Sequence, residues 1–382
     1  MHVLTLTPFY PTASNDVRGC FVAEPLPGLE REGVAQTILA VQPFHHGLAR
    51  PAAAVFPAHW VHFFMPPAGW GLAWSGAFLY ASLLPRIRRI HAAHPVNLIH
   101  AHAALPCGHA AHLLNRELGI PFVVTVHGLD TYYKNQVGGI AGRWCERISR
   151  LVYRSAAQVI CISEKVREQV LAGAAVRTAV VYNGVDPQEF SPGADNPASD
   201  FLLTVGNLIP IKGHELLLRA FAALPSRHSD IRCQIIGDGP ERSRLTALAA
   251  SLGIASRVQF LGRQSRRQVA EAMRGCLLFA LPSRYEGLGC VYLEAMSSAR
   301  AVIACRGQGI EEVIQQGVNG WLIEPENLAA LTAALTALLD DPQLRRRMGE
   351  SARSTILRGF TIVHQAAALA QLYNDCVCLP AS

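Results

Sequence analysis

Two glutamates, Glu286 and Glu294, stand eight residues apart at the start of a predicted helix. Gly287-Leu288-Gly289 interrupts helix and strand alike, whereas residues 291–298 carry apolar side chains at helical spacing, so the order is strand, loop, helix. A helix N-terminus favours an anion such as a diphosphate, and an ionised carboxylate accepts hydrogen bonds from hydroxyl groups. Because a helix rises about 1.5 Å per residue, the two carboxylates should lie roughly 8 Å apart, at either end of a diphosphate. A plain capping role for each glutamate is the alternative.

A lysine near two glycines is the second candidate. The predicted strand 202–205 is followed by Gly206 and, six residues later, by Lys212. The chain contains only two other lysines, Lys134 and Lys165, and its remaining basic residues are arginines or histidines. A compact ammonium on a loop at the carboxyl end of a strand is suited to phosphate oxygens. We therefore expect Lys212 to bind phosphate.

Histidines gather in the first half of the chain. His127 follows the predicted strand 122–126 and precedes Gly128 and Asp130. A histidine at a strand end can act chemically or pack as an ordinary loop residue, and the neighbouring glycine and aspartate favour function. A second group of histidines lies upstream and consists of His100, His102, His109 and His112. Their spacing matches that of metal ligands only in part, and no carboxylate accompanies them, so we interpret them as core or loop histidines.

The elements that must position these residues alternate between strand and helix. Such alternation predicts parallel sheets covered by helices on both faces, in two halves joined by the Pro-rich linker 186–200. Ligands in such sheets bind beyond the carboxyl ends of the strands, so two facing halves predict an interdomain cleft. The expected strands are 3–7, 37–41, 97–100, 122–126, 158–162, 201–205, 233–236, 258–261, 277–281 and 301–304.

Composition excludes several classes of protein. The 382 residues are 50% hydrophobic and 16% charged, which excludes intrinsic disorder and allows two domains. The net charge of +6 is spread along the chain without a dense basic block, so we expect no nucleic-acid partner. The ten cysteines form no paired C-x-x-C elements, and no cleavable signal sequence is recognised, so reduced thiols and a cytoplasmic location are expected.

The segment 51–85 lacks Lys, Arg, Asp and Glu and is rich in tryptophan and phenylalanine. Its uninterrupted piece, 68–84, is short for a membrane span. Directly after it come Arg86, Arg88 and Arg89, and an apolar face beside a basic cluster fits peripheral contact with an anionic membrane at its cytoplasmic (inner) face. An ordinary buried helix with a solvated basic end fits the pattern as well.

Residues 282–296 resemble the E-x7-E signature of family 4 glycosyltransferases, and the resemblance continues from Gly307 to Ile323. It implies an α/β protein of the GT-B fold, with two Rossmann-like doubly wound domains facing an interdomain cleft. We expect an acceptor-side domain at 1–187 and a nucleotide-sugar-binding domain at 188–360. The remaining helix, 361–382, is expected to pack back on the first domain.

The resemblance also implies roles for single residues. Glu286, His127 and Lys212 are expected to be catalytic, and His127 to approach the donor sugar. The acceptor side is expected to contain Arg18, Gly19 and Asp130. The expected donor-binding residues are Glu294, Gly206, Asn207, Lys212, Arg263, Gly287, Leu288, Gly289 and Cys290.

The expected activity is that of a retaining, metal-independent hexosyltransferase without a cofactor. It would move a sugar from a nucleotide-diphosphate sugar to a glycan or lipid-linked acceptor, in cell-surface polysaccharide or glycoconjugate biosynthesis. The chain departs from the family pattern at Asn207, where an arginine is usual, and at Gly19, where two glycines are usual. A sugar-nucleotide 2-epimerase of the same fold and a catalytically silent binding subunit are the alternatives.

Overall fold

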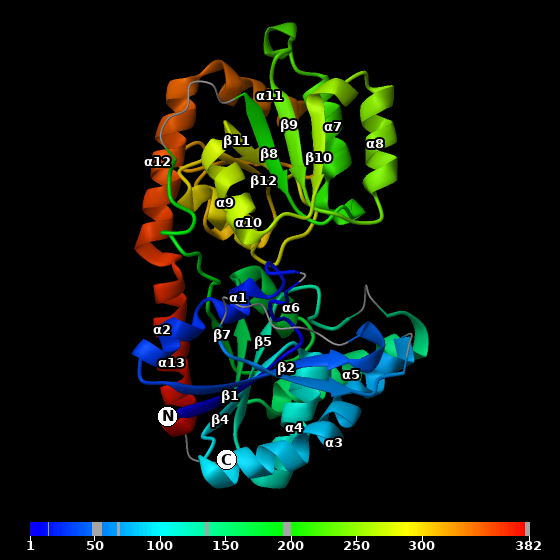
Figure 1. Cartoon of the computed structure of the whole chain (residues 1–382), viewed down its shortest axis with the longest axis vertical. Coiled ribbons are helices and arrows are strands. Elements are labelled where there is room, and N and C mark those ends of the chain that lie inside the picture. Colours follow the sequence, from blue (N-terminus) through cyan, green and yellow to red (C-terminus); the bar gives the residue numbers. More distant parts are fainter. Residues whose placement is uncertain (14, 48–55, 67–68, 134–136, 194–199, 379–382) are drawn as a thin grey trace. The chain divides into compact units, whose positions relative to one another are not determined.

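The computed structural model describes residues 1–382 except 14, 48–55, 67–68, 134–136, 194–199 and 379–382. It divides into two compact units, which Figure 1 labels element by element. The first unit comprises Met1–Asn183 and Ile362–Ser382, and the second comprises Gly184–Thr361. Each contains one parallel β-sheet with helices on its faces, so the expected pair of doubly wound α/β domains is confirmed.

The first unit contains a seven-stranded sheet in the order β3-β2-β1-β4-β5-β6-β7. Strand β1 pairs in parallel with β2 on one side and with β4 on the other, and the central strands are buried. The strands are β1 (His2–Thr7), β2 (Ala35–Pro43), β3 (His59–Phe63), β4 (Leu98–His102), β5 (Phe122–Val126), β6 (Gln158–Cys161) and β7 (Thr178–Val180).

The helices of this unit include one that is distant in sequence. Helix α13 shares a hydrophobic core with α2, in which Leu369 and Tyr373 pack with Leu26 and Leu29. Helix α6 begins at a cap, because the side chain of Ser163 accepts from the backbone N–H of Val166. The helices are α1 (Cys20–Ala23), α2 (Leu26–Arg31), α3 (Gly69–Ala93), α4 (His109–Leu118), α5 (Gly139–Ser155), α6 (Glu164–Leu171) and α13 (Ile362–Cys378).

The second unit contains a six-stranded parallel sheet in the order β10-β9-β8-β11-β12-β13. Its apolar strands pack against the helices in a core that includes Leu202, Phe221 and Ile303. The strands are β8 (Phe201–Val205), β9 (Arg232–Ile236), β10 (Val258–Gly262), β11 (Leu278–Ala280), β12 (Val302–Cys305) and β13 (Trp321–Ile323). The helices are α7 (His214–Ala222), α8 (Arg242–Ser251), α9 (Arg266–Gly275), α10 (Cys290–Ser297), α11 (Leu328–Asp340) and α12 (Pro342–Gly359).

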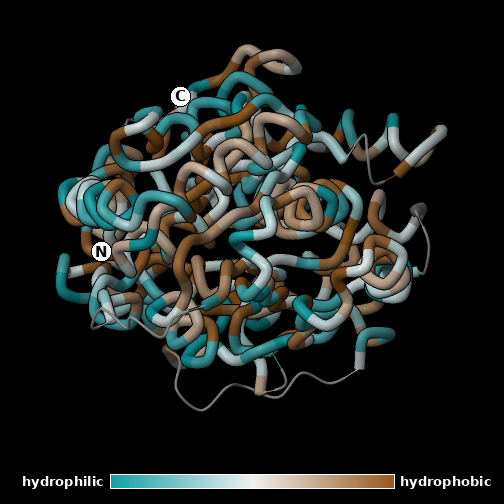
Figure 2. Tube along the Cα trace, turned by 90° about the horizontal axis from the view of Figure 1, so that it is seen from above, coloured by the Kyte–Doolittle hydropathy of each residue, from teal (hydrophilic) through white to brown (hydrophobic). Residues whose placement is uncertain are grey.

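Helices α5 and α9 are amphipathic, and the peripheral trace in Figure 2 changes between hydrophobic and hydrophilic along its length. Helix α3 is 25 residues long. It contains most of the expected apolar piece, continues through Pro85 and includes Arg86, Arg88 and Arg89. Among the described residues, no helical segment combines the length and hydrophobicity that crossing a bilayer requires.

Candidate active site

The loops after β8 and β11 form the candidate site. These neighbouring strands mark the point where the strand order of the second sheet reverses, which is where doubly wound sheets bind ligands. The loops touch, because the backbone N–H of Arg284 donates to the carbonyl of Ile211 at 2.8 Å. Gly213 permits this approach: it has φ +71°, and a Cβ there would lie 2.0 Å from the carbonyl oxygen of Pro282.

Lys212 and Glu286, one from each loop, form an ion pair. Lys212 Nζ donates to Glu286 Oε1 at 2.7 Å, and Ser283 Oγ donates to the same oxygen at 2.8 Å. The Glu286 side chain is 8% exposed, and its backbone N–H donates to Gln308 Oε1 at 3.0 Å. Two side-chain donors therefore hold the carboxylate, and the contact with Gln308 holds the backbone of the same residue. Both side-chain donors use Oε1, so the second carboxylate oxygen accepts from neither of them.

Helix α10 begins directly after this pair. Its N-cap, Gly289, has φ 86° and, as a glycine, has no side chain with which to cap the helix. Leu288 is fully buried beneath it, whereas Cys290 is half-buried. A helix N-terminus beside a lysine gives an anion two favourable charges in one place. The arrangement therefore suits a diphosphate, as the sequence predicts.

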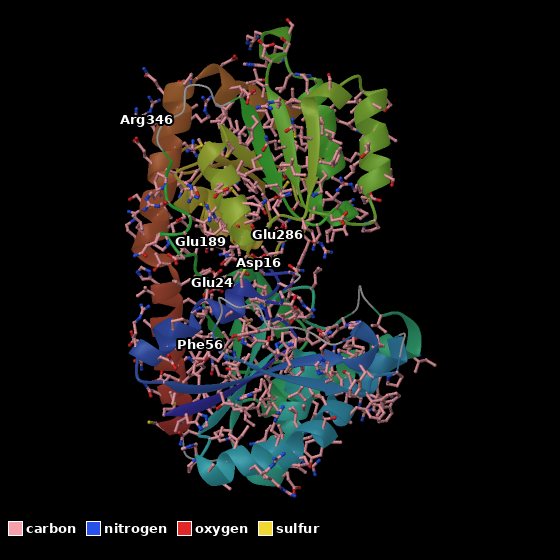
Figure 3. The ribbon with its side chains drawn as sticks, in the orientation of Figure 1. Asp16, Glu24, Phe56, Glu189, Glu286 and Arg346 are labelled. Carbon is pink, nitrogen blue, oxygen red and sulfur yellow. The ribbon has the colours of Figure 1, made fainter. Side chains whose placement is uncertain are left out.

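Glu294, one turn into α10, is bound by an arginine that sequence reasoning missed. Arg266 Nη1 lies 2.6 Å from Glu294 Oε1, and both side chains are largely buried. Arg266 Nε lies 3.3 Å from Glu189 Oε2, and the guanidinium stacks over the ring of Phe190 at 4.6 Å. Glu189 and Glu286 lie toward the same end of the second unit (Figure 3). Arg266 thus fixes the position of Glu294.

Two other predicted donor-binding residues are more exposed. Arg263 follows β10 and points into solvent, three residues before Arg266. Asn207 is exposed after β8, and its carbonyl accepts from His214 Nε2 at 3.2 Å. Gly206, between β8 and Asn207, is half-buried, and its backbone N–H donates to the carbonyl of Ile236 at 2.9 Å.

In the first unit, His127 belongs to a row of histidines, of which His100 and His102 are buried. His102 Nδ1 lies 3.1 Å from His127 Nε2, so one ring donates and the other accepts. His100 bonds Thr125 Oγ1 and the Tyr373 hydroxyl, each at 2.7 Å. The other ring nitrogen of His127, Nδ1, is buried and has no hydrogen-bond partner among the described residues. The described residues contain no group of three or more His, Cys, Asp or Glu that could hold a metal ion.

Burial keeps this row uncharged. It lowers the pKa of His100 and of His127 to about 3, and that of His102 well below the usual value, with a further contribution from neighbouring imidazoles for His100 and His102. The row thus consists of neutral imidazoles that can donate or accept a hydrogen bond but carry no charge near neutral pH.

We expect the first unit to lose stability as the pH falls below about 6.5. The unfolded chain binds protons at its histidines in this range, whereas the folded row does not, so each histidine lowers the free energy of unfolding by about 1.4 kcal/mol per pH unit. Asp130 has the opposite effect and offsets the contribution of one histidine. Burial raises the pKa of its carboxyl to about 6, so as the pH falls the folded carboxyl binds its proton at a higher pH than the unfolded one.

Denaturant titrations followed by tryptophan fluorescence at several pH values between about 7 and 5 would measure this slope. Four of the five tryptophans lie in the first unit, so the signal reports on it. His102→Gln should reduce the slope by the equivalent of one proton. A free energy of unfolding that is constant over this range would show that the buried imidazoles ionise in the folded state.

The predicted acceptor-side residues lie on loops after β1 and β5. Arg18 is half-buried, and its Nη2 donates to the carbonyl of Pro8 at 2.9 Å. Gly19 has φ +70°, and a Cβ there would lie 2.3 Å from the carbonyl carbon of Phe9, so no other residue fits. Asp130 is buried, and its Oδ1 accepts from the backbone N–H of His127 at 2.9 Å, which stabilises the loop that carries His127.

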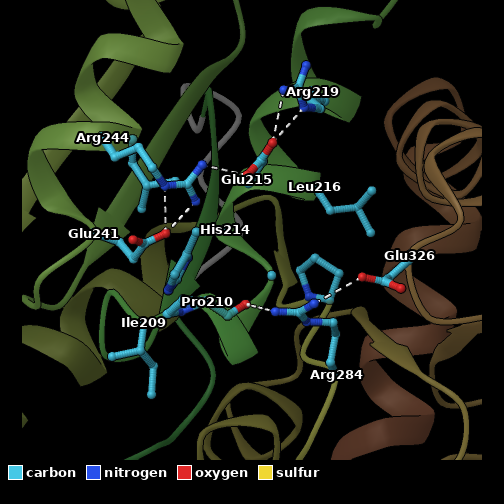
Figure 4. A pocket seen from close by; sticks show the side chains of 13 residues that line it. Ile209, Pro210, His214, Glu215, Leu216, Arg219, Glu241, Arg244, Arg284 and Glu326 are labelled. Carbon is cyan, nitrogen blue, oxygen red and sulfur yellow. Dashed lines mark hydrogen bonds and ion pairs between the residues drawn. The ribbon is translucent and has the colours of Figure 1, made fainter.

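A pocket of about 320 Å³ lies beside the two loops but includes none of Lys212, Glu286 and Glu294. Figure 4 shows that its charged side chains pair with each other, Glu215 with two arginines and Arg284 with Glu326. Because these charges are already paired, a charged ligand is not required to balance them, and we assign no ligand to this pocket. Its lining residues are Ile209, Pro210, Gly213, His214, Glu215, Leu216, Arg219, Glu241, Arg244, Leu245, Pro282, Arg284 and Glu326.

Two family sequence models match most of the chain. The family described as Glycosyl transferases group 1 matches residues 186–355, and the family described as Glycosyltransferase Family 4 matches residues 21–189. The two matches meet at the boundary between the structural units. They support the resemblance on which the site prediction depends.

Individual relatives agree with these matches. An uncharacterized glycosyltransferase of Methanocaldococcus jannaschii is 32% identical over 259 residues, which cover 68% of this chain and 70% of the relative. The alpha-D-kanosaminyltransferase of Streptomyces kanamyceticus is 30% identical over 302 residues, 72% of this chain and 77% of the relative. The structure of Anabaena HepE in complex with UDP-glucose has a TM-score of 0.77 at 20% identity, over 98% of this chain and 100% of that one, which shows a shared fold.

Proposed function

The chain belongs to glycosyltransferase family 4 and has the GT-B fold, and from this we infer that it transfers a sugar from a nucleotide-diphosphate sugar with retention of the anomeric configuration. The observation that carries this proposal is the Lys212–Glu286 pair at the switch point, beside the start of α10. The solved structure of HepE holds UDP-glucose, and a ligand of that class has hydroxyl groups at both ends of a diphosphate.

The donor would lie across the start of α10. Its diphosphate would bind Lys212 and the backbone of residues 287–290, with the sugar near Glu286 and the ribose near Glu294. The proposed cation is a lysine with three N–H donors, of which one bonds Glu286 in the structure. Since fixed positive charge is present, we propose that the reaction needs no metal. The usual arginine is Asn207 here, so Lys212 supplies more of the charge.

The proposed chemistry is a front-face displacement. The bond between the anomeric carbon and the diphosphate oxygen breaks while the acceptor hydroxyl attacks from the same face. The leaving phosphate oxygen takes the acceptor's proton, so no separate base is required. Glu286 offsets positive charge at the anomeric centre, and Lys212 offsets negative charge on the leaving group. A contact of His127 with the donor sugar stays a prediction.

We propose a glycan or lipid-linked acceptor in cell-surface polysaccharide or glycoconjugate biosynthesis, and a cytoplasmic reaction. The loop at Arg18 and Gly19 supports this acceptor class, since it resembles the acceptor-side loop of bacterial polysaccharide transferases. The pocket of Figure 4 has no part in this proposal.

A thermal-shift panel tests donor binding directly. UDP, GDP and ADP, and then their sugar conjugates, should raise the unfolding midpoint according to affinity, because saturating ligand stabilises by RT ln(1 + [L]/Kd). One nucleotide should raise the midpoint at a concentration far below that required of the others. The same nucleotide should raise the midpoint of Lys212→Ala by less. The preferred sugar conjugate is then incubated with glycan acceptors. A chain that binds no diphosphate, or that only epimerises the free sugar nucleotide, would contradict the proposal.

We expect Glu294→Ala to raise the donor KM while kcat is largely kept. Its proposed partners, the ribose hydroxyls, are bound equally in the ground state and the transition state. Steady-state rates over a range of donor concentrations give both constants. Arg266→Gln is the matched test of positioning and should raise the same KM, because Glu294 would lose the group that fixes it. A collapse of kcat at unchanged KM would reject this assignment.

A further inference from the structure

The first unit exposes a cluster of aromatic side chains. Trp74 and Phe78 lie one turn apart on α3 and are 48% and 38% exposed. Phe64, which follows β3, is 59% exposed and contacts the Phe78 ring edge-on at 5.3 Å between centroids. The Trp74 ring stacks on that of Trp144 from α5, at 5.5 Å and 29°. Isolated exposed apolar residues are common, but a contiguous group marks a site of interaction.

Helix α5 continues this surface with a basic edge. Ile140, Arg143, Trp144 and Arg147 lie on one side of the helix within two turns. Ile140 is 63% exposed, and both arginines are exposed. The buried side of α5 is formed by other residues, among them Cys145. We call Phe64, Trp74, Phe78, Ile140 and Trp144, together with Arg143 and Arg147, the aromatic face.

The charge of the aromatic face points to an anionic partner. Its described residues are apolar or basic, and the nearest acid on α5, Glu146, is bound by Arg150 Nη2 at 2.6 Å. Tryptophan and phenylalanine beside arginine are the residues that settle at the headgroup level of a bilayer.

The aromatic face differs from the basic cluster predicted from sequence. Arg88 lies fourteen residues after Trp74, which is roughly 21 Å along the helix at about 1.5 Å per residue. It also forms an ion pair with Glu117. The aromatic face therefore combines apolar side chains of α3 with basic side chains of α5, a combination that the sequence pattern of α3 does not reveal.

We propose that the aromatic face binds the surface of an anionic lipid membrane. Its aromatic rings enter the headgroup region, and Arg143 and Arg147 contact lipid phosphates and anionic headgroups. The bilayer is touched from one side and is not crossed, in agreement with the absence of a spanning helix among the described residues. This proposal is independent of the proposed transferase activity, because its readout is binding to lipid.

Co-sedimentation of the full chain with vesicles tests the proposal. The protein should bind vesicles of phosphatidylcholine mixed with phosphatidylglycerol more tightly than vesicles of phosphatidylcholine alone, and less tightly in high salt. Arg143→Gln with Arg147→Gln should weaken binding to the mixed vesicles by roughly fivefold for each charge. These side chains are exposed, so the variant should fold normally.

Apolar variants and matched controls complete the test. Phe64→Ser with Phe78→Ser should weaken binding about tenfold or more on both vesicle types, because apolar area stays in water. Arg88→Gln with Arg89→Gln changes the same number of charges elsewhere on α3 and should have little effect. Leu357→Ser removes an exposed apolar side chain of the second unit and should have none. Circular dichroism confirms the fold of each variant.

Three outcomes would overturn the proposal. The parent protein could fail to sediment with anionic vesicles, or all variants could bind as the parent does. Alternatively, light scattering could show a concentration-dependent dimer that Phe64→Ser with Phe78→Ser abolishes, which would assign the aromatic face to a second copy of the chain. Loss of binding in the aromatic-face variants alone would support the membrane.

Discussion

Lys212→Ala should lower kcat/KM for sugar transfer by about 100-fold or more. The ammonium lies 2.7 Å from Glu286 Oε1, at the switch point and beside the start of α10. Negative charge on the leaving diphosphate grows as its bond to the sugar breaks, so the lost stabilisation is greatest in the transition state. Initial rates over a range of donor concentrations, together with the nucleotide Kd, would show that the loss exceeds the loss of binding.

Lys165→Ala is the matched control for this variant. Lys165 lies on α6 of the first unit, and its removal changes the net charge by the same amount. Equal losses in the two variants would mean that Lys212 is ordinary surface charge. A double-mutant cycle with Glu286→Gln adds a further test, because residues that act as a unit give losses that do not add. Fully additive losses would contradict the paired role that the geometry supports.

The sequence was sufficient for the architecture, and it indicated two residues that the structure brings together at the switch point. Strands such as 122–126 and 201–205 are buried on both faces, so their apolar runs are continuous and easy to recognise. The loops after β8 and β11 contain glycines and polar residues that a strand or helix does not explain. Lys212 and Glu286 could therefore be predicted as functional from residue type and position, although their mutual ion pair could not.

The missed strands lack this signal. β7 and β13 have three residues each, and β3, at an edge of the sheet, has two polar histidines among its five residues. Short edge strands are specified by the neighbour to which they bond, and that neighbour is known only after the sheet is assembled. The same limit applies to every element whose pattern is too short to show a period.

Arg266 was missed for a related reason. Arg263 directly follows β10 and was the visible candidate, but the capping box of Ser265 and Gln268 starts α9 soon afterwards and places Arg266 in its first turn. The contact with Glu294 depends on how α9 packs against α10, which no local pattern reveals. The signal that could have found Arg266 is its position on a predicted first helical turn close to the strand ends.

The contact between His102 and His127 could be found once strand order is known. The two residues are 25 positions apart, and β4 and β5 pair in parallel with His102 opposite Thr125. This register brings the residues that follow both strands to one edge of the sheet. The sequence predicted both strands but not their pairing. It therefore indicated His127 but not the hydrogen bond between His127 and His102.

Glu286→Gln should lower kcat by at least about 100-fold while the affinity for the nucleotide is almost unchanged. Glutamine keeps the size of the side chain and an oxygen that can accept from both Ser283 and Lys212, so the loop should keep its structure. What is lost is the negative charge that offsets the oxocarbenium-like transition state. Rates and a nucleotide titration by calorimetry separate the two quantities. A fully active variant would exclude this role.

The stereochemistry of the product tests the same mechanism without a substitution. If the acceptor attacks from the face that the diphosphate leaves, an α-configured donor gives an α-linked product, and proton NMR of the isolated product distinguishes the two anomers. An inverting enzyme needs a base on the opposite face of the sugar, and Glu286 is poorly suited to that task because Lys212 and Ser283 both donate to its Oε1. A β-linked product from an α-configured donor would therefore reject both the front-face displacement and the supporting role of Glu286.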